Sequence, residues 1–214
     1  MSVLVKICGL STPDAVRAAV DGDADLVGFV FFPKSPRSVT PELASVLAER
    51  ARAQGVKVVA VTVDASDETI DAIARTLQPD LIQLHGHETP ARASEVRTRT
   101  GAGVIRALRV SDVADLDAAP AFEEAVDYLM FDAKAPVGAV LPGGNGVAFD
   151  WSLLAGRSYA RPWFLAGGLN PENVAEAVKA SGASLVDVSS GVETVPGVKD
   201  PALIKAFLEA ARRA

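Results

Sequence analysis

The chain has 214 residues, of which 49% are hydrophobic and 22% are charged, and its formal net charge is −6. This size and composition favour one domain, residues 1–214, with a large apolar core. The acidic balance argues against nucleic acid and anionic membranes as partners, because both require a basic surface, whereas a locally positive pocket can still bind a small anion. The single cysteine, Cys8, excludes an intrachain disulfide and a cysteine-rich metal site, so we expect a cytoplasmic protein with no metal.

Residues 1–7 show no basic leader followed by a long apolar stretch, and no run in the chain approaches about 20 apolar residues, so we expect neither an export signal nor a membrane span. Short apolar runs rich in Val, Ile, Leu and Phe recur instead, and Gly, Pro or Asp flank them. Their length and continuous hydrophobicity are typical of parallel strands covered on both faces. The predicted strands are Val3–Ile7, Leu26–Phe32, Val56–Val63, Leu81–Leu84, Val104–Val110, Tyr128–Phe131, Trp163–Ala166 and Leu185–Val188.

Amphipathic stretches separate these runs, and four of them begin with a capping side chain followed by proline. Proline is well tolerated at the first position of a helix, where its missing N–H has no partner to lose. The four starts are Thr12-Pro13, Thr40-Pro41, Asn170-Pro171 and Asp200-Pro201. Residues 41–53 place Leu43, Val46 and Leu47 at helical spacing, and residues 67–77 and 201–213 have similar patterns.

A strand and a helix therefore alternate about eight times along the chain. Roughly 27 residues per unit is close to the minimum for a compact (β/α)₈ repeat, so we expect an α/β fold of the TIM-barrel type. A doubly wound open sheet shares the alternation and is the alternative. No linker or low-complexity segment marks a domain boundary.

In such a barrel, functional groups gather where the strands end, and Cys8 stands at the first of these positions. A lone cysteine on an apolar strand is commonly an inert buried thiol. Nearby basic groups and helix N-termini can instead lower the pKa of a thiol toward neutrality, which makes it a usable general base.

Asp132 ends the strand at Tyr128–Phe131, where an acid without a partner would be costly to bury. It could cap a helix or pair with Lys134. At a barrel mouth, a carboxyl whose pKa is raised is also suited to protonate a leaving oxygen.

Two small-residue loops follow the seventh and eighth predicted strands. Barrel enzymes commonly bind a phosphate there, on backbone N–H groups and the start of a helix. Together these loops predict a phosphate site made by Gly167, Gly168, Ser189, Ser190 and Gly191.

Three further features are candidates for substrate contacts. The Pro33–Ser38 loop carries Lys34 and Arg37 and could clamp a carboxylate, or be an exposed basic loop. His85 could line a pocket or be an ordinary core histidine, and it is not at metal-ligand spacing with His87. Residues 141–146 are glycine-rich and could form a lid or a plain loop.

In their order along the chain, these residues resemble the phosphoribosylanthranilate isomerase family of tryptophan biosynthesis. The matching motifs are Lys6–Leu10, Gly28–Arg37, Gln83–Gly86, Phe131–Asp132, Phe149–Trp151, Leu165–Leu169 and Asp187–Glu193. Asn145 departs from the family's pattern in the glycine-rich loop.

The resemblance implies an Amadori rearrangement of a phosphorylated aminosugar without metal or cofactor. It implies that Asp132 is the general acid, Cys8 the general base and Arg37 a contact to the anthranilate carboxylate. His85 would line the same pocket, and Asp187 is a weaker candidate for substrate binding.

Two competing interpretations remain at this stage. The related isomerase of histidine biosynthesis performs the same rearrangement on a substrate with two phosphates, but uses a pair of aspartates and two similar half-barrels. A non-catalytic phosphosugar-binding barrel would need the phosphate loops alone. The sequence is compatible with a monomer or a homodimer.

Overall fold

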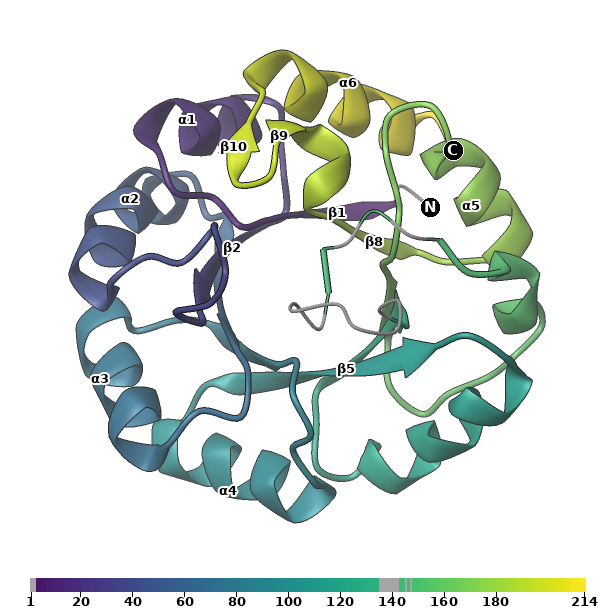
Figure 1. Ribbon diagram of the computed structural model, residues 1–214, viewed down its shortest axis with the longest axis horizontal. Helices are drawn as coiled ribbons and strands as arrows, with labels where there is room; N and C mark the ends of the chain where they lie inside the picture. Colours follow the sequence, from purple (N-terminus) through teal and green to yellow (C-terminus); the bar gives the residue numbers. More distant parts are fainter. Residues whose placement is uncertain (1–2, 135–142, 145, 147) are drawn as a thin grey trace.

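The computed structural model describes residues 3–134, 143, 144, 146 and 148–214. Eight parallel strands form a closed barrel in the order β1 to β8, with β1 paired to β8, which confirms the predicted TIM barrel and excludes the open sheet (Figure 1). The strands are β1 Leu4–Cys8, β2 Leu26–Phe31, β3 Lys57–Thr62, β4 Leu81–Leu84, β5 Gly103–Val110, β6 Tyr128–Ala133, β7 Trp163–Leu165 and β8 Leu185–Val188.

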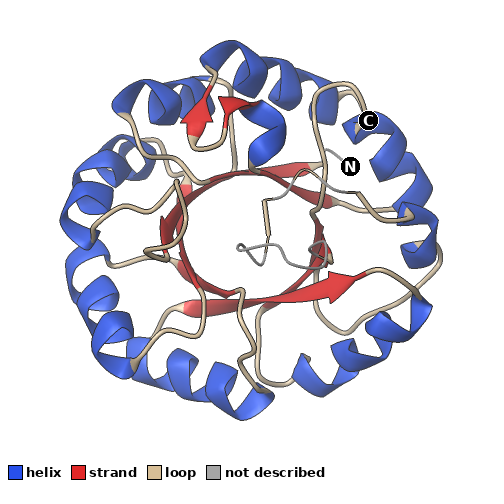
Figure 2. Cartoon of the chain, viewed as in Figure 1, coloured by secondary structure: helices blue, strands red, loops and turns tan. Residues whose placement is uncertain are grey.

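Helices form the outer ring around the barrel (Figure 2). The α-helices of the described ranges are α1 Pro13–Asp21, α2 Pro41–Ala53, α3 Asp67–Leu77, α4 Pro90–Thr100, α5 Val174–Ser181 and α6 Pro201–Arg212. Short 3₁₀ helices lie at η1 Val113–Phe122, η2 Trp151–Leu154 and η3 Ser190–Val192, and a small hairpin pairs β9 Glu193–Val195 with β10 Val198–Lys199. No helix among these is long and apolar enough to cross a membrane.

The predicted helix starts are correct at three of four positions. The side chains of Thr12, Thr40 and Asp200 each accept a backbone hydrogen bond from the first turn. The side chain of Asn170 instead accepts from the N–H groups of Glu172 and Asn173 and closes a turn, so α5 begins only at Val174. Asn and Asp side chains bond to the backbone in this way in turns as readily as at helix caps.

The apolar face predicted for α2 is partly wrong. Val46 is 64% exposed and Leu43 is 44% exposed, although both fall at helical spacing. The buried face consists of Leu47 and three small residues, Ala44, Ala48 and Ala51. Small side chains allow the helix to lie close to the strands, so the alanines rather than the larger residues face the core.

Alternate side chains along each strand enter two different apolar clusters. On β3, Val58 and Ala60 belong to the cluster between barrel and helices, whereas Val59 and Val61 belong to the cluster inside the barrel. Met130 and Phe164 help to fill the interior. This two-residue period of strands directs every second side chain into the barrel, including those nearest its mouth.

At the N-terminal end of the barrel, an aspartate precedes each of β2, β4 and β6. The carboxylates of Asp25, Asp80 and Asp127 accept hydrogen bonds from the N–H groups of Val5, Val58 and Val104, respectively. The backbone N–H of each aspartate donates to the carbonyl of the same valine. Each aspartate therefore fixes the register of two neighbouring strands where they begin.

We expect the Asp80→Ala substitution to lower the free energy of unfolding by about 1–3 kcal/mol, because it leaves the N–H of the buried Val58 without its partner. Urea denaturation measures this as a lower midpoint with an unchanged slope. Asp80→Asn is the matched control, since its amide oxygen can still accept the bond. Equal stability of Asp80→Ala and the wild type would show that the carboxylate does not fix the register.

Candidate active site

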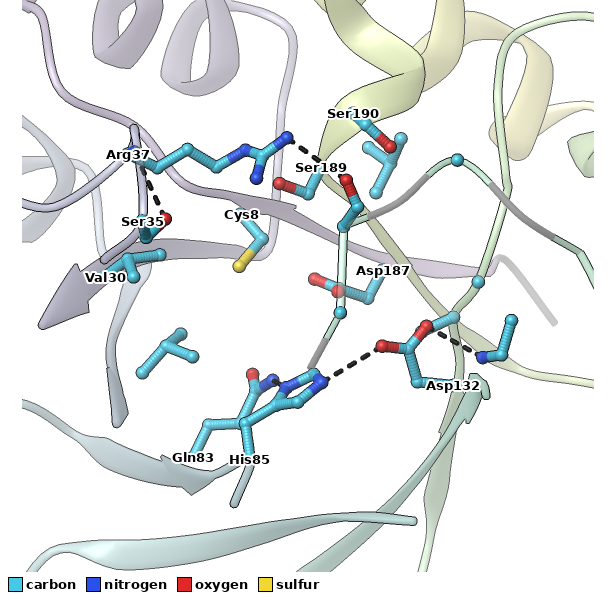
Figure 3. A pocket seen from close by; sticks show the side chains of 18 of the residues that line it. Cys8, Val30, Ser35, Arg37, Gln83, His85, Asp132, Asp187, Ser189 and Ser190 are labelled. Carbon is cyan, nitrogen blue, oxygen red and sulfur yellow. Dashed lines mark hydrogen bonds and ion pairs between the residues drawn. The ribbon is translucent and has the colours of Figure 1, made fainter. Parts of the chain in front are cut away.

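One pocket opens at the carboxyl ends of the barrel strands and contains most of the predicted site residues (Figure 3). Its lining includes Cys8, Arg37, His85, Asp132, Gly167, Gly168, Asp187, Ser189 and Ser190. Gly191 lies outside this lining and packs against the backbone of Leu169, where a β-carbon would collide with the carbonyl oxygen. The exposed Lys34 is also outside it, so Arg37 is the cation of the Pro33–Ser38 loop that reaches the pocket.

Cys8 shares the inward face of β1 with Lys6, a residue that the sequence analysis did not identify. Lys6 is fully buried, and its Nζ lies 2.8 Å from Asp187 Oδ1 on β8. Burial opposes the positive charge, but Asp187 and then Cys8 outweigh it and raise the pKa of Lys6. A charged residue within the apolar run Val3–Ile7, two positions before Cys8, was the available signal.

The environment of the thiol differs from the one expected. Burial raises the pKa of Cys8, and Asp187 adds to this effect, while Lys6 and Lys199 oppose it only in part. Of the two environments that the sequence allows, the buried thiol rather than the thiol with a lowered pKa describes Cys8. A β-carbon at Gly28 would come within 3.2 Å of Cys8 Sγ, so glycine on β2 makes room for the thiol.

Asp132 faces the pocket from β6 and is bound on both carboxylate oxygens. Its Oδ2 lies 3.0 Å from His85 Nε2, and its Oδ1 accepts the N–H of Ala133 at 2.9 Å. The alternative of a salt bridge with Lys134 is wrong, because Lys134 lies near Asp115 instead. His85 is therefore a pocket residue paired with the acid rather than an isolated core histidine (Figure 3).

Arg37 is buried and joined to the β9–β10 hairpin. Its Nε and Nη2 donate to the two carboxylate oxygens of Glu193 at 2.7 and 2.8 Å, and Nη2 also lies 3.3 Å from the carbonyl of Gly144. Burial opposes the charge on Glu193, but Arg37 and Lys199 hold the pKa of this carboxyl below its ordinary value. The interpretation of this loop as an exposed basic loop is therefore wrong for Arg37.

Lys199 is a second buried cation that sequence reasoning missed. Its Nζ donates to Glu193 Oε1 at 2.6 Å and to the carbonyl of Ser189 at 2.8 Å. Burial lowers the pKa of Lys199, and Glu193 acts in the opposite direction. The turn sequence Pro196-Gly197 between two valine-containing segments was a hairpin signal, but it did not indicate where the hairpin would fold.

The loop after β7 has the backbone shape expected of an anion site. Gly167 and Gly168 both have positive φ values, 85° and 67°, and a β-carbon on Gly167 would collide with the backbone of Ala133. Among the described residues, nothing accepts a hydrogen bond from the N–H groups of these two glycines. The Asn173 side chain holds the loop from behind by donating to the carbonyl of Gly168 at 2.9 Å.

Of the predicted lid at residues 141–146, the structure describes Gly143, Gly144 and Gly146, and Asn145 lies outside the described residues. Gly143 and Gly144 both line the pocket. A β-carbon at Gly143 would come within 2.6 Å of His85 Nε2, so this backbone packs directly against the site.

Comparison with known proteins gives a consistent result. A family model described as N-(5'-phosphoribosyl)anthranilate (PRA) isomerase matches residues 5–210. A relative from Caulobacter vibrioides named N-(5'-phosphoribosyl)anthranilate isomerase is 61% identical over 98% of this chain and 95% of its own length.

Two solved structures are also similar over nearly the whole chain. Phosphoribosyl anthranilate isomerase from Thermotoga maritima aligns with a TM-score of 0.88 and 39% identity, covering 99% of this chain and 100% of its own. A phosphoribosyl anthranilate isomerase in complex with reduced 1-(o-carboxyphenylamino)-1-deoxyribulose 5-phosphate aligns with a TM-score of 0.85 and 36% identity, covering the same shares.

The raised pKa of Cys8 predicts how its thiol titrates in the empty site. The thiol stays protonated at neutral pH, and thiolate forms only as the pH rises past the ordinary thiol pKa of about 8.5. Ultraviolet absorbance of the thiolate measures this directly, because Cys8 is the single cysteine. The Cys8→Ala variant serves as the blank that removes the tyrosine signal, and a midpoint at or below that of a free thiol would contradict the prediction.

Proposed function

Because the chain belongs to the N-(5'-phosphoribosyl)anthranilate isomerase family, we propose that Cys8 is the general base and Asp132 the general acid of its reaction. Family membership makes the protein an isomerase of tryptophan biosynthesis. The main support for the two roles is that Cys8 on β1 and Asp132 on β6 line one pocket, and the phosphate-binding candidates follow the two strands between them.

The rearrangement begins at the ribose ring. Asp132 delivers a proton to the ring oxygen, the bond from C1 to that oxygen breaks, and the lone pair of the anthranilate nitrogen forms a C1–N double bond. The product of this step is an open-chain iminium ion, and Asp132 becomes a carboxylate. A positioned acid of this kind typically accelerates such a step by about 10²–10⁴-fold.

Cys8 acts in the second step. After its own thiol proton has passed to solvent, Cys8 as thiolate takes the proton from C2, and the electrons of that bond form a C1–C2 double bond and neutralise the nitrogen. The resulting enolamine tautomerises when a proton moves from the C2 hydroxyl to C1, which gives the ketone. C1 is reduced while C2 is oxidised, so the reaction is an internal redox change and consumes no external electron acceptor.

The charge of the iminium ion helps the thiol to serve as a base. Burial disfavours the thiolate in the empty pocket. A cation formed next to Cys8 favours the thiolate, as Lys6 and Lys199 already do in part. Proton removal from C2 is thereby coupled to completion of ring opening.

The two ends of the substrate determine its orientation in the pocket. We place the phosphate on Gly167, Gly168, Ser189 and Ser190, which line the pocket, and the N–H groups of the two glycines lack partners among the described residues. Glu193 already occupies the Nε and Nη2 side of Arg37. The Nη1 group of Arg37 is then the part available to the anthranilate carboxylate, and Asp187 acts through Lys6 rather than by direct contact.

We expect Cys8→Ala and Asp132→Asn each to lower kcat by about 10²-fold or more, because each removes one proton-transfer group. Loss of phosphoribosylanthranilate fluorescence measures the rate, and circular dichroism checks that the fold is intact. Asp80→Asn, at the opposite end of the barrel, is the control and retains wild-type turnover. Near-normal rates in both site variants would contradict the roles assigned to Cys8 and Asp132, whereas a wild-type protein without turnover would indicate a non-catalytic phosphosugar-binding barrel.

A further inference from the structure

A chain of three side chains leads from the barrel interior to the candidate acid. Gln83 on β4 is buried, and its Nε2 lies 2.9 Å from His85 Nδ1. On the other side of the imidazole ring, His85 Nε2 lies 3.0 Å from Asp132 Oδ2. Gln83 therefore reaches Asp132 only through His85 (Figure 3).

The surroundings of Gln83 decide which way its amide points. With the nitrogen toward His85, one N–H donates to Nδ1 and the nitrogen also lies 3.4 Å from Met130 Sδ, while the amide oxygen has no partner among the described residues. In the reverse orientation, the Gln83 amide oxygen would face His85 and Met130 Sδ. Both amide N–H donors would then occupy the position where the structure offers no hydrogen-bond partner. Burying two unpaired donors costs more than burying one unpaired acceptor, so the first orientation is favoured.

This orientation fixes the proton on the imidazole ring. Nδ1 of His85 accepts from Gln83, so the single proton of the neutral ring is on Nε2. His85 Nε2–H then donates to Asp132 Oδ2, and the N–H of Ala133 donates to Oδ1. Both oxygens of the buried Asp132 carboxyl group thereby accept a hydrogen bond from a neighbouring donor.

Gly143 lies against this pair at the edge of the pocket. A β-carbon at Gly143 would lie 2.6 Å from His85 Nε2 and 2.7 Å from Asp132 Oδ2. Any side chain at this position would therefore collide with the pair, and glycine leaves Asp132 accessible from the pocket.

We propose that Gln83 is a positioning residue that holds His85 as the neutral Nε2–H tautomer, so that His85 stabilises the carboxylate that Asp132 becomes after it protonates the ring oxygen. The inference rests on the proposed role of Asp132 and adds the residues that tune it. The proton goes from Asp132 to the substrate oxygen, and His85 donates a hydrogen bond without transferring its own proton.

The other tautomer would oppose this step. With the proton on Nδ1, the lone pair of Nε2 would face the Asp132 carboxylate and repel it. Asp132 could relieve that repulsion by keeping its proton and donating it to Nε2, which withholds the proton from the substrate. The tautomer of His85 therefore decides whether Asp132 gives its proton to the substrate oxygen or shares it with His85 Nε2.

Histidine NMR tests the tautomer directly, because the chain has only two histidines. We expect the spectrum of ¹⁵N-histidine-labelled protein to show His85 with a protonated Nε2 and an unprotonated Nδ1 at neutral pH. His87→Asn assigns the signals, since the side chain of His87 is 77% exposed and pairs with Asp64 outside the pocket. A protonated Nδ1 on His85 in the wild type, as the other tautomer or as imidazolium, would overturn the proposal.

Kinetics of two Gln83 variants test the consequence. In Gln83→Glu, the new carboxylate requires a proton on Nδ1, and in Gln83→Met the donor to Nδ1 is lost. We expect kcat to fall about tenfold or more in both, with a smaller change in KM, because losing the residue that fixes a histidine tautomer lowers kcat strongly in other active sites. His87→Asn keeps the wild-type kcat and serves as the matched control.

The results separate failure of this inference from failure of the proposed function. If Asp132→Asn is inactive but Gln83→Glu protonates Nδ1 and keeps the wild-type kcat, the role of Gln83 is refuted and the role of Asp132 stands. If the Asp132→Asn variant keeps the wild-type rate, Asp132 is not the general acid. The tautomer of His85 then has no role in the reaction.

Discussion

The pairing of β1 with β8 closes the barrel, and the arrangement of the site depends on it. Lys6 and Asp187 are register partners across this seam, and their side chains form the buried ion pair beside Cys8. Breaking such a pair leaves an uncompensated buried charge, which is strongly destabilising. Closure of the sheet and completion of the thiol's environment are therefore one event, because the same two residues take part in both.

Each buried charged side chain around the pocket has a polar or charged partner. Lys6 pairs with Asp187, Arg37 and Lys199 share Glu193, and Asp132 is bonded to His85. Cys8 shares these surroundings without an ion-pair partner of its own, and burial accordingly raises its pKa. In the proposed mechanism the pocket thus keeps its base neutral until the iminium ion forms beside it.

Sequence reasoning identified the strands and most of the pocket because both follow from local patterns. Apolar runs mark strands, and parallel strands bring their carboxyl ends together, so Cys8, Asp132 and Asp187 could be assigned to one mouth. The residues it missed depend on contacts that form only in the closed barrel: Lys6 pairs with Asp187 across the seam between β1 and β8, and Gln83 meets Met130 in the barrel interior. Depth of burial is equally non-local, so the sequence leaves open whether the pKa of Cys8 is raised or lowered.

The distance along the chain between Lys6 and Asp187, 181 positions, also bears on how the protein is made. During synthesis, Lys6 leaves the ribosome early, and its ammonium group remains in water until β8 emerges. A partial barrel gives the Lys6 ammonium group no buried partner, so burying β1 before β8 forms would cost free energy. Burial of β1 therefore becomes favourable only when β8 is present. A nascent chain that lacks β8 is expected to leave β1 exposed to solvent.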